Sequence, residues 1–141
     1  MYGTRSASTP QAPAALAAGQ KGRTMYGLPK RFKGEFLVGR TLELICFAQY
    51  QVNLHFDENV SIVVESALSH QESSNSAIRR VKIPVAQSDL MVLLGHSILK
   101  AFGDDEGTLT IEFDNGRVLQ CFDQPAYEAY HIIQGEDEII V

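Results

Sequence analysis

Four histidines, the side chains best suited to metal or acid–base chemistry, stand at positions 55, 70, 96 and 131. No two of them have the HxH or HExxH spacing of a metal site. Neither Cys46 nor Cys121 has the CxxC neighbour that a zinc site commonly uses. The sequence therefore predicts no metal site and no cofactor.

Nucleophilic and acid–base catalysis have little support. The chain has no GxSxG elbow, and both cysteines lie in apolar alternating segments, where a thiol is usually inert. A pair of carboxylates for glycosidic chemistry could come from Asp104, Asp105, Asp114 or Asp123. Acidic residues at hairpin tips are also what turns require, so no catalytic residue is assigned. The pattern favours a protein that is not an enzyme and leaves an enzyme open.

The elements that must position these residues are strands. In "QVNLHF", Val52, Leu54 and Phe56 alternate with polar residues, which is typical of a half-buried strand. The same alternation appears in "TLTIEF", before the turn residues Asp114-Asn115-Gly116. A short helical turn is expected after Ser88, ended by Gly95, followed by a strand over 98–102.

Two segments, about 31–66 and 87–123, look like copies of one unit. Gly39 aligns with Gly95 and Thr41 with Ser97, both at an offset of 56 residues. The predicted fold is α+β, mainly antiparallel, built from two duplicated strand-hairpin units with one or two short helices. The two sheets should bury four apolar side chains between them: Leu54, Phe56, Ile111 and Phe113.

The chain divides into a tail and one domain. Residues 1–27 are rich in Ala, Gly, Ser, Thr, Pro and Gln, so we expect either a disordered tail or an upstream extension, with Met25 as the alternative start. Residues 28–141 are long enough for a single domain with its own core. No run approaches the ~20 apolar residues of a membrane span, and we expect a cytoplasmic protein with free thiols.

Charge favours a basic protein as partner. All seventeen acidic residues lie at position 35 or later, whereas four of the twelve basic residues come before position 31. An acidic domain repels nucleic acid and anionic membranes and attracts basic partners. We expect the hairpin tip Asp104, Asp105 and Glu106 to steer such a partner, and Tyr127 and Tyr130 to fill the interface.

Two other functions stay open. A small-molecule site or an active site could occupy a cleft between the two repeats, lined by His55, Glu112 and His131. Alternatively, the chain could self-associate through an exposed edge strand at Ile139–Val141.

The stretch "GTLTIEFDNGRVLQCFDQPAYEAYHI" resembles small uncharacterised bacterial β-rich families, in which an FD(D/N)G strand-turn precedes a Tyr-Glu-Ala-aromatic strand. "FLVGRTLELICF" is similar to the opening strand of such proteins. The resemblance covers residues 28–141 and implies a β-rich fold without an established activity. Proteins of this kind are sometimes immunity partners of toxins, so the leading expectation is a non-catalytic immunity-type or regulatory binding module.

Overall fold

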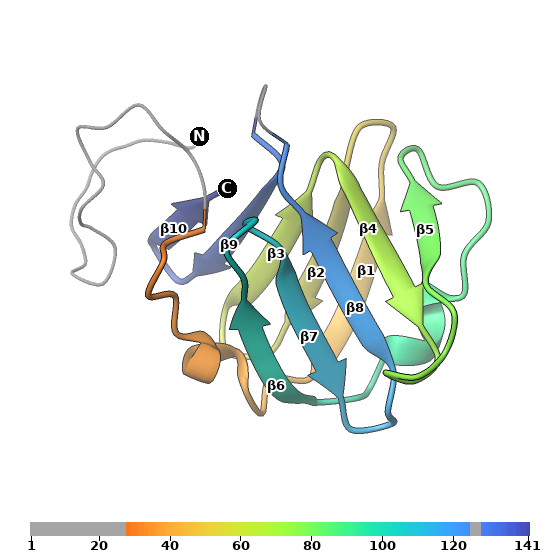
Figure 1. The fold of residues 1–141 in the computed structure, drawn as a ribbon, viewed down its shortest axis with the longest axis horizontal. Helices are drawn as coiled ribbons and strands as arrows, with labels where there is room; N and C mark the ends of the chain where they lie inside the picture. Colours follow the sequence, from red (N-terminus) through yellow and green to blue (C-terminus); the bar gives the residue numbers. More distant parts are fainter. Residues whose placement is uncertain (1–27, 125–127) are drawn as a thin grey trace.

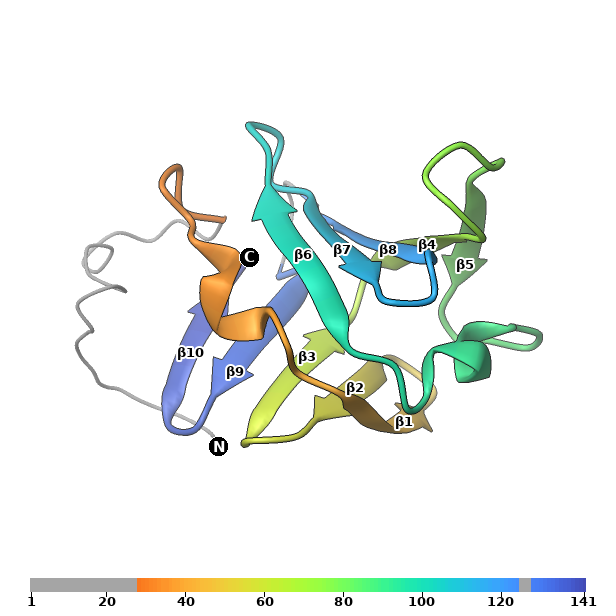
Figure 2. The same cartoon turned by 90° about the horizontal axis from the view of Figure 1, so that it is seen from below.

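The computed structural model describes residues 28–124 and 128–141, which form two facing five-stranded antiparallel sheets (Figures 1 and 2). Sheet 1 has the strand order β1-β2-β3-β9-β10 and sheet 2 the order β5-β4-β8-β7-β6. The strands of the first half are β1 (Leu42–Phe47), β2 (Val52–Phe56), β3 (Val60–Val64), β4 (Ala67–Gln71) and β5 (Arg79–Lys82). Those of the second half are β6 (Ile98–Gly103), β7 (Leu109–Phe113), β8 (Val118–Phe122), β9 (Tyr130–Gln134) and β10 (Asp137–Ile140).

Alternation of apolar and polar residues decides which face each strand buries. In β2, β3 and β7 every second side chain is buried, beginning with the first. The four side chains expected between the sheets, Leu54, Phe56, Ile111 and Phe113, are at most 4% exposed. The Phe56 and Phe113 rings stack across the core with centroids 6.5 Å apart. The predicted interior is therefore confirmed at these positions.

Each sheet contains a hairpin from the other half of the chain. Strands β1–β3 lie together in sheet 1, but the following hairpin, β4–β5, joins sheet 2 beside β8. Strands β6–β8 lie in sheet 2, and the hairpin β9–β10 joins sheet 1 beside β3. Both sheets are thus completed by exchange, which places residues far apart in sequence on one surface.

The two halves meet through reciprocal contacts. The Gly39 amide donates to the Ile98 carbonyl (2.7 Å), and the Gly95 amide donates to the Leu42 carbonyl (2.8 Å). Thr41 and Ser97 form an isolated antiparallel bridge between these bonds. Thr41 and Ser97, matched at an offset of 56 in the sequence, therefore face each other at the junction of the halves, and the matched glycines make equivalent bonds on either side of them.

The predicted antiparallel strands are confirmed, but the α+β label is not, because the only helices of the described residues are single 3-10 turns. These are η3 (Gly34–Leu37) and η4 (Leu90–Leu93). Ser88 Oγ accepts from the Leu90 amide (2.9 Å), but the chain leaves the turn almost at once and Gly95 takes a left-handed φ of +83°. A four-residue turn gives too few hydrogen bonds to continue as an α-helix.

Other predictions near the ends have mixed outcomes. The strand at Ile139–Val141 corresponds to β10, an edge of sheet 1, while the tail prediction for residues 1–27 lies outside the described residues. Within the described ranges, the helices are too short to cross a membrane.

Candidate functional site

A histidine surrounded by carboxylates lies on the outer face of sheet 1. Strand β9 buries Tyr130 and Ile132 and so turns His131 outward. His131 Nδ1 is 2.6 Å from Glu138 Oε2, and His131 Nε2 is 3.3 Å from Glu128 Oε1 and 3.9 Å from Glu65 Oε2. These four residues are called the His131 cluster.

The backbone fixes the carboxylates of the cluster around the imidazole. Glu65 leaves the end of β3, and its amide donates to the Ala129 carbonyl (2.7 Å). Ala129 in turn donates its amide to the Val141 carbonyl (2.6 Å). Glu138 lies on β10, which pairs with β9. Three separate segments therefore converge on His131 because the second hairpin completes sheet 1.

Electrostatics favour a positive charge at His131. Its side chain is only 14% exposed. Burial by itself lowers the pKa of His131, but the hydrogen bond to Glu138 and the charges of Glu65 and Glu128 outweigh burial and raise that pKa above 6.5. The Nε2 atom is buried and has no hydrogen-bond partner among the described residues. The cluster can therefore hold a proton or another cation.

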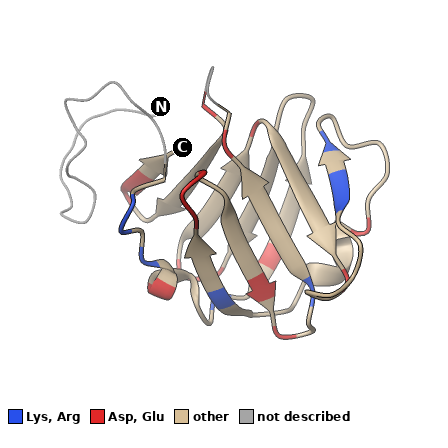
Figure 3. Cartoon of the chain, in the orientation of Figure 1, with Lys and Arg blue, Asp and Glu red and all other residues tan. Residues whose placement is uncertain are grey.

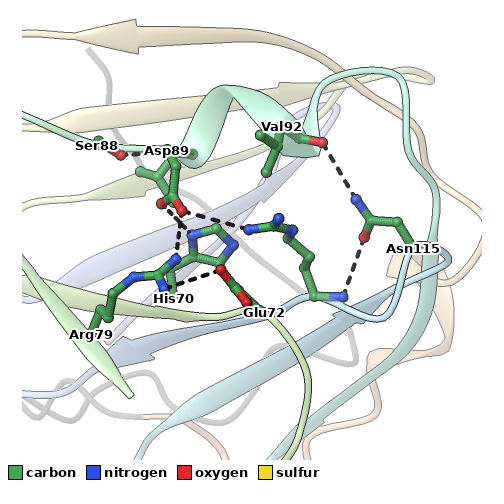
Figure 4. A network of polar contacts seen from close by, with 9 residues as sticks. His70, Glu72, Arg79, Ser88, Asp89, Val92 and Asn115 are labelled. Carbon is green, nitrogen blue, oxygen red and sulfur yellow. Dashed lines mark hydrogen bonds and ion pairs between the residues drawn. The ribbon is translucent and has the colours of Figure 1, made fainter. Parts of the chain in front are cut away.

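A second polar network surrounds His70, whose side chain is completely buried (Figure 4). His70 Nδ1 is 2.8 Å from Asp89 Oδ1. Arg79 and Arg117 approach the other oxygen of Asp89, with Arg117 Nη1 at 3.5 Å. Arg79 also pairs with Glu72 at 3.6 Å. The network joins β4, the start of β5 and the β7–β8 turn to Asp89, the residue that precedes η4.

Burial decides the protonation of His70. It lowers the pKa of His70 below 6.5, although the Asp89 carboxylate acts in the opposite direction. For Asp89, burial would raise the pKa, but the His70 hydrogen bond and the nearby cations lower it. Because the imidazole has no exposed surface, His70 itself presents no reactive group to solvent, and the network positions η4.

The predicted acidic tip is built on a tight turn between β6 and β7. Asp104 Oδ1 accepts from the amides of Glu106 (2.9 Å) and Thr108 (3.0 Å). Asp123 lies against Gly107, so four carboxylates occur close together at one end of the sandwich, where Figure 3 shows acidic colour at the β6–β7 tip and basic colour on the neighbouring segment before η3. Within residues 28–124 and 128–141, Asp104, Asp105, Glu106 and Asp123 form no ion pair.

The family model called "Family of unknown function (DUF6188)" matches residues 35–141, which include all ten strands. The chain belongs to DUF6188. This match confirms the predicted resemblance to a family without an established function. Among curated proteins and solved structures, no significant match to this DUF6188 chain is found.

Of the two tyrosines predicted at a partner interface, Tyr130 has no exposed surface in the DUF6188 chain. Its hydroxyl donates to the Gly107 carbonyl at 2.6 Å, and its ring belongs to the core. Tyr130 therefore offers no contact area to a partner, because strand alternation turned it inward. Tyr127 lies outside the described residues.

The three residues predicted to share a cleft do not come together in the DUF6188 fold. His55 lines an open depression of about 480 Å³ beside the β2–β3 and β9–β10 turns. Glu112 lies on β7 of sheet 2, and His131 lies in its own cluster on sheet 1. Apolar side chains fill the space between the sheets, which leaves His55 and His131 on the outer face of sheet 1 and Glu112 on the outer face of sheet 2.

Sequence reasoning missed most partners of His131 and His70. Glu138 was detectable, because a hairpin at Gly135 places it diagonally across from His131. Glu65 and Asp89 gave no local signal, since tertiary structure alone brings them to His131 and His70.

Proposed function

We propose that this DUF6188 protein is a non-catalytic protein-binding module whose partner is a basic protein, in an immunity-type or regulatory role. The observation that carries the proposal is the acidic tip, Asp104, Asp105 and Glu106, together with Asp123. None of these carboxylates is neutralised by a basic side chain in the described part of the chain.

The tip is suited to electrostatic steering. Concentrated charge of one sign accelerates association with an oppositely charged surface. The Asp104 side chain holds two amides of its own turn, so the carboxylates are presented on an ordered loop. A partner that meets them loses little freedom in ordering that loop.

The proposal is tested with full-length protein as bait, in a native lysate at low and moderate salt, followed by mass spectrometry. One variant carries D104N, D105N and E106Q, in which the amide oxygen at position 104 can still accept both turn hydrogen bonds. The matched control carries E35Q, E43Q and E58Q, which removes the same charge from exposed positions elsewhere.

A basic protein that is retained by wild type and by the control, and is weakened by salt and by the tip variant, supports the proposal. Purified partner and bait should then bind with an association rate that the tip variant lowers by roughly tenfold or more. Equal capture by all three baits, or capture of no protein, contradicts it.

Small-molecule binding is the second candidate, and the depression beside His55 favours it. Its volume of about 480 Å³ falls within the range of ligand sites, roughly 300–1,000 Å³. A fragment screen by NMR should shift the amide signals of His55, Ser61 and Ile133 together if this depression binds ligands. Shifts scattered over both sheets would contradict a site there.

We also propose that the two halves arose by duplication and that the protein works in the cytoplasm. Support for duplication comes from the reciprocal bonds of Gly39 and Gly95. Support for the compartment comes from the free thiols of Cys46 and Cys121, which a reducing compartment preserves.

A further inference from the structure

We propose that Glu65, Glu128 and His131 bind a divalent transition-metal ion, for which Zn²⁺ is the reference probe. This inference is independent of the protein-binding proposal, because it concerns a different surface feature and a different ligand.

The donor atoms are close enough for coordination. One ligand atom from each of the three residues lies within 4.8 Å of the others. Ligand atoms of a tetrahedral zinc site, each about 2.0–2.2 Å from the metal, are roughly 3.3–3.6 Å apart. His131 Nε2 and Glu128 Oε1 already have this separation, at 3.3 Å. The Glu65 oxygen, at 3.9 Å, reaches it by a small rotation of a side chain that is 38% exposed.

The imidazole is oriented as metal-binding histidines usually are. Such histidines donate their second ring nitrogen to a carboxylate or carbonyl, which fixes the tautomer and directs the free lone pair at the metal. His131 Nδ1 meets Glu138 Oε2 at 2.6 Å, which places that proton on Nδ1. The Nε2 atom is then free, buried and without a hydrogen-bond partner in the described ranges, and it faces Glu65 and Glu128.

Charge balance also calls for a cation. The cluster contains three carboxylates and one imidazole, and no lysine or arginine of the described residues forms an ion pair with them. A donor set of one nitrogen and two carboxylate oxygens suits Zn²⁺ or Mn²⁺ better than Mg²⁺, which prefers oxygen alone. With three protein ligands, a fourth position is left for water or for another donor.

The protein supplies its own control in His96. His96 Nδ1 is 2.7 Å from Asp114 Oδ1, which reproduces the contact between His131 and Glu138. Among the described residues, Asp114 is the only acidic partner of His96. If a histidine–carboxylate pair were enough to bind metal, substitution of His96 and of His131 would weaken Zn²⁺ binding equally.

The test is isothermal titration of the full chain with Zn²⁺ at pH 7.5, after removal of metal with a chelator, with Mg²⁺ for comparison. We expect one tight site per chain, weakened by roughly 100-fold or more in H131Q and E128Q and about 10–100-fold in E138Q. H96Q should bind as wild type does, and Mg²⁺ should bind more weakly than Zn²⁺. Binding should also weaken at pH 6, because protons compete for Nε2.

Circular dichroism checks the folding of every variant. If H131Q does not fold, E128Q replaces it in the test, because Gln has nearly the shape of Glu and the Glu128 side chain is partly exposed. No stoichiometric Zn²⁺ binding by wild type would overturn the proposal. So would Zn²⁺ binding that folded E128Q retains, or that H96Q loses as fully as H131Q. None of these outcomes bears on the capture of a basic protein.

Discussion

Thr41 Oγ1 and Ser97 Oγ lie 2.8 Å apart at the point where the two halves of the chain cross. On either side of this contact, backbone hydrogen bonds run in both directions between Arg40–Leu42 and His96–Ile98. At this distance one hydroxyl of the pair donates to the other, and the bond joins two half-buried side chains from the two halves.

The hydroxyl pair should contribute to stability in a coupled way. T41V and S97A should each lower the free energy of unfolding by about 0.5–1.5 kcal/mol. The double variant should lose less than the sum, because the first substitution already removes the bond. Urea unfolding of the four proteins measures the coupling, and fully additive losses would show that the pair contributes nothing as a pair.

Gly39 and Gly95 should be equally intolerant of a side chain. Their φ angles are +87° and +83°, and a Cβ at either position would meet no atom within 4 Å. The cost of G39A and G95A therefore comes from the backbone alone, about 1–2 kcal/mol each. Denaturant unfolding should give matching losses. A loss at one position only would mean that the two turns are not energetically equivalent.

Asp89 should matter more than its exposure suggests, because it serves His70 and two arginines at once. D89N should lower the free energy of unfolding by about 1–3 kcal/mol. E72Q removes one long pair between exposed side chains and should cost under about 0.5 kcal/mol. Equal effects of the two substitutions, measured by thermal or urea unfolding, would contradict the assignment of η4 positioning to Asp89.

Protonation of His70 should destabilise the fold as pH falls. Burial lowers its pKa in the folded state, so below about pH 6.5 the unfolded chain binds a proton that the folded chain refuses. The free energy of unfolding should therefore decrease from pH 6.5 downward. H70N, whose side-chain amide can still donate to Asp89, should show a shallower decrease in urea titrations at successive pH values.

His131 should act in the opposite direction in the absence of metal. Its pKa is raised in the folded state, so its contribution is fully present below about pH 6.5 and is lost as pH rises through the higher folded value. The stability difference between wild type and H131Q should shrink above pH 6.5 in chelator-treated samples. A difference that grows with pH would reverse the sign of the cluster's effect.

The Tyr130 hydroxyl should stabilise the fold without touching a partner. Y130F removes the bond to the Gly107 carbonyl and leaves that acceptor unpaired, at a cost of about 1–2 kcal/mol. Partner capture at a temperature where the variant is folded should equal that of wild type. Loss of capture by a fully folded Y130F would restore Tyr130 to the interface.

The sequence predicted the strands well because their signals are local. Alternation located β2 and β7, and the aligned glycines identified Gly39 and Gly95 as equivalent turns. The α+β label is not confirmed, since a Ser88 cap and a run of apolar residues look alike in the sequence of an α-helix and of a single 3-10 turn. The sequence also placed Tyr130 at an interface, because alternation alone does not say which face is covered.

The site was largely hidden from the sequence for a different reason. His131 and Glu138 are neighbours in one hairpin, but Glu65 joins them only because β9 pairs with β3. His70 meets Asp89 through the packing of η4. Contacts of this kind depend on tertiary structure, and no rule based on the spacing of residues in the sequence predicts them.

Because the hairpins are exchanged, each sheet is complete only when strands from both halves of the chain have formed. Residues 42–64 can form three strands early, but the neighbour that β3 needs lies about 70 residues further along the chain. The chain loses the entropy of closing that long loop before the pairing of β3 with β9 stabilises it. We therefore expect slow folding for a domain of this size. Until then β3 is an open edge, and two molecules folding side by side could complete each other's sheets with the hairpins β9–β10.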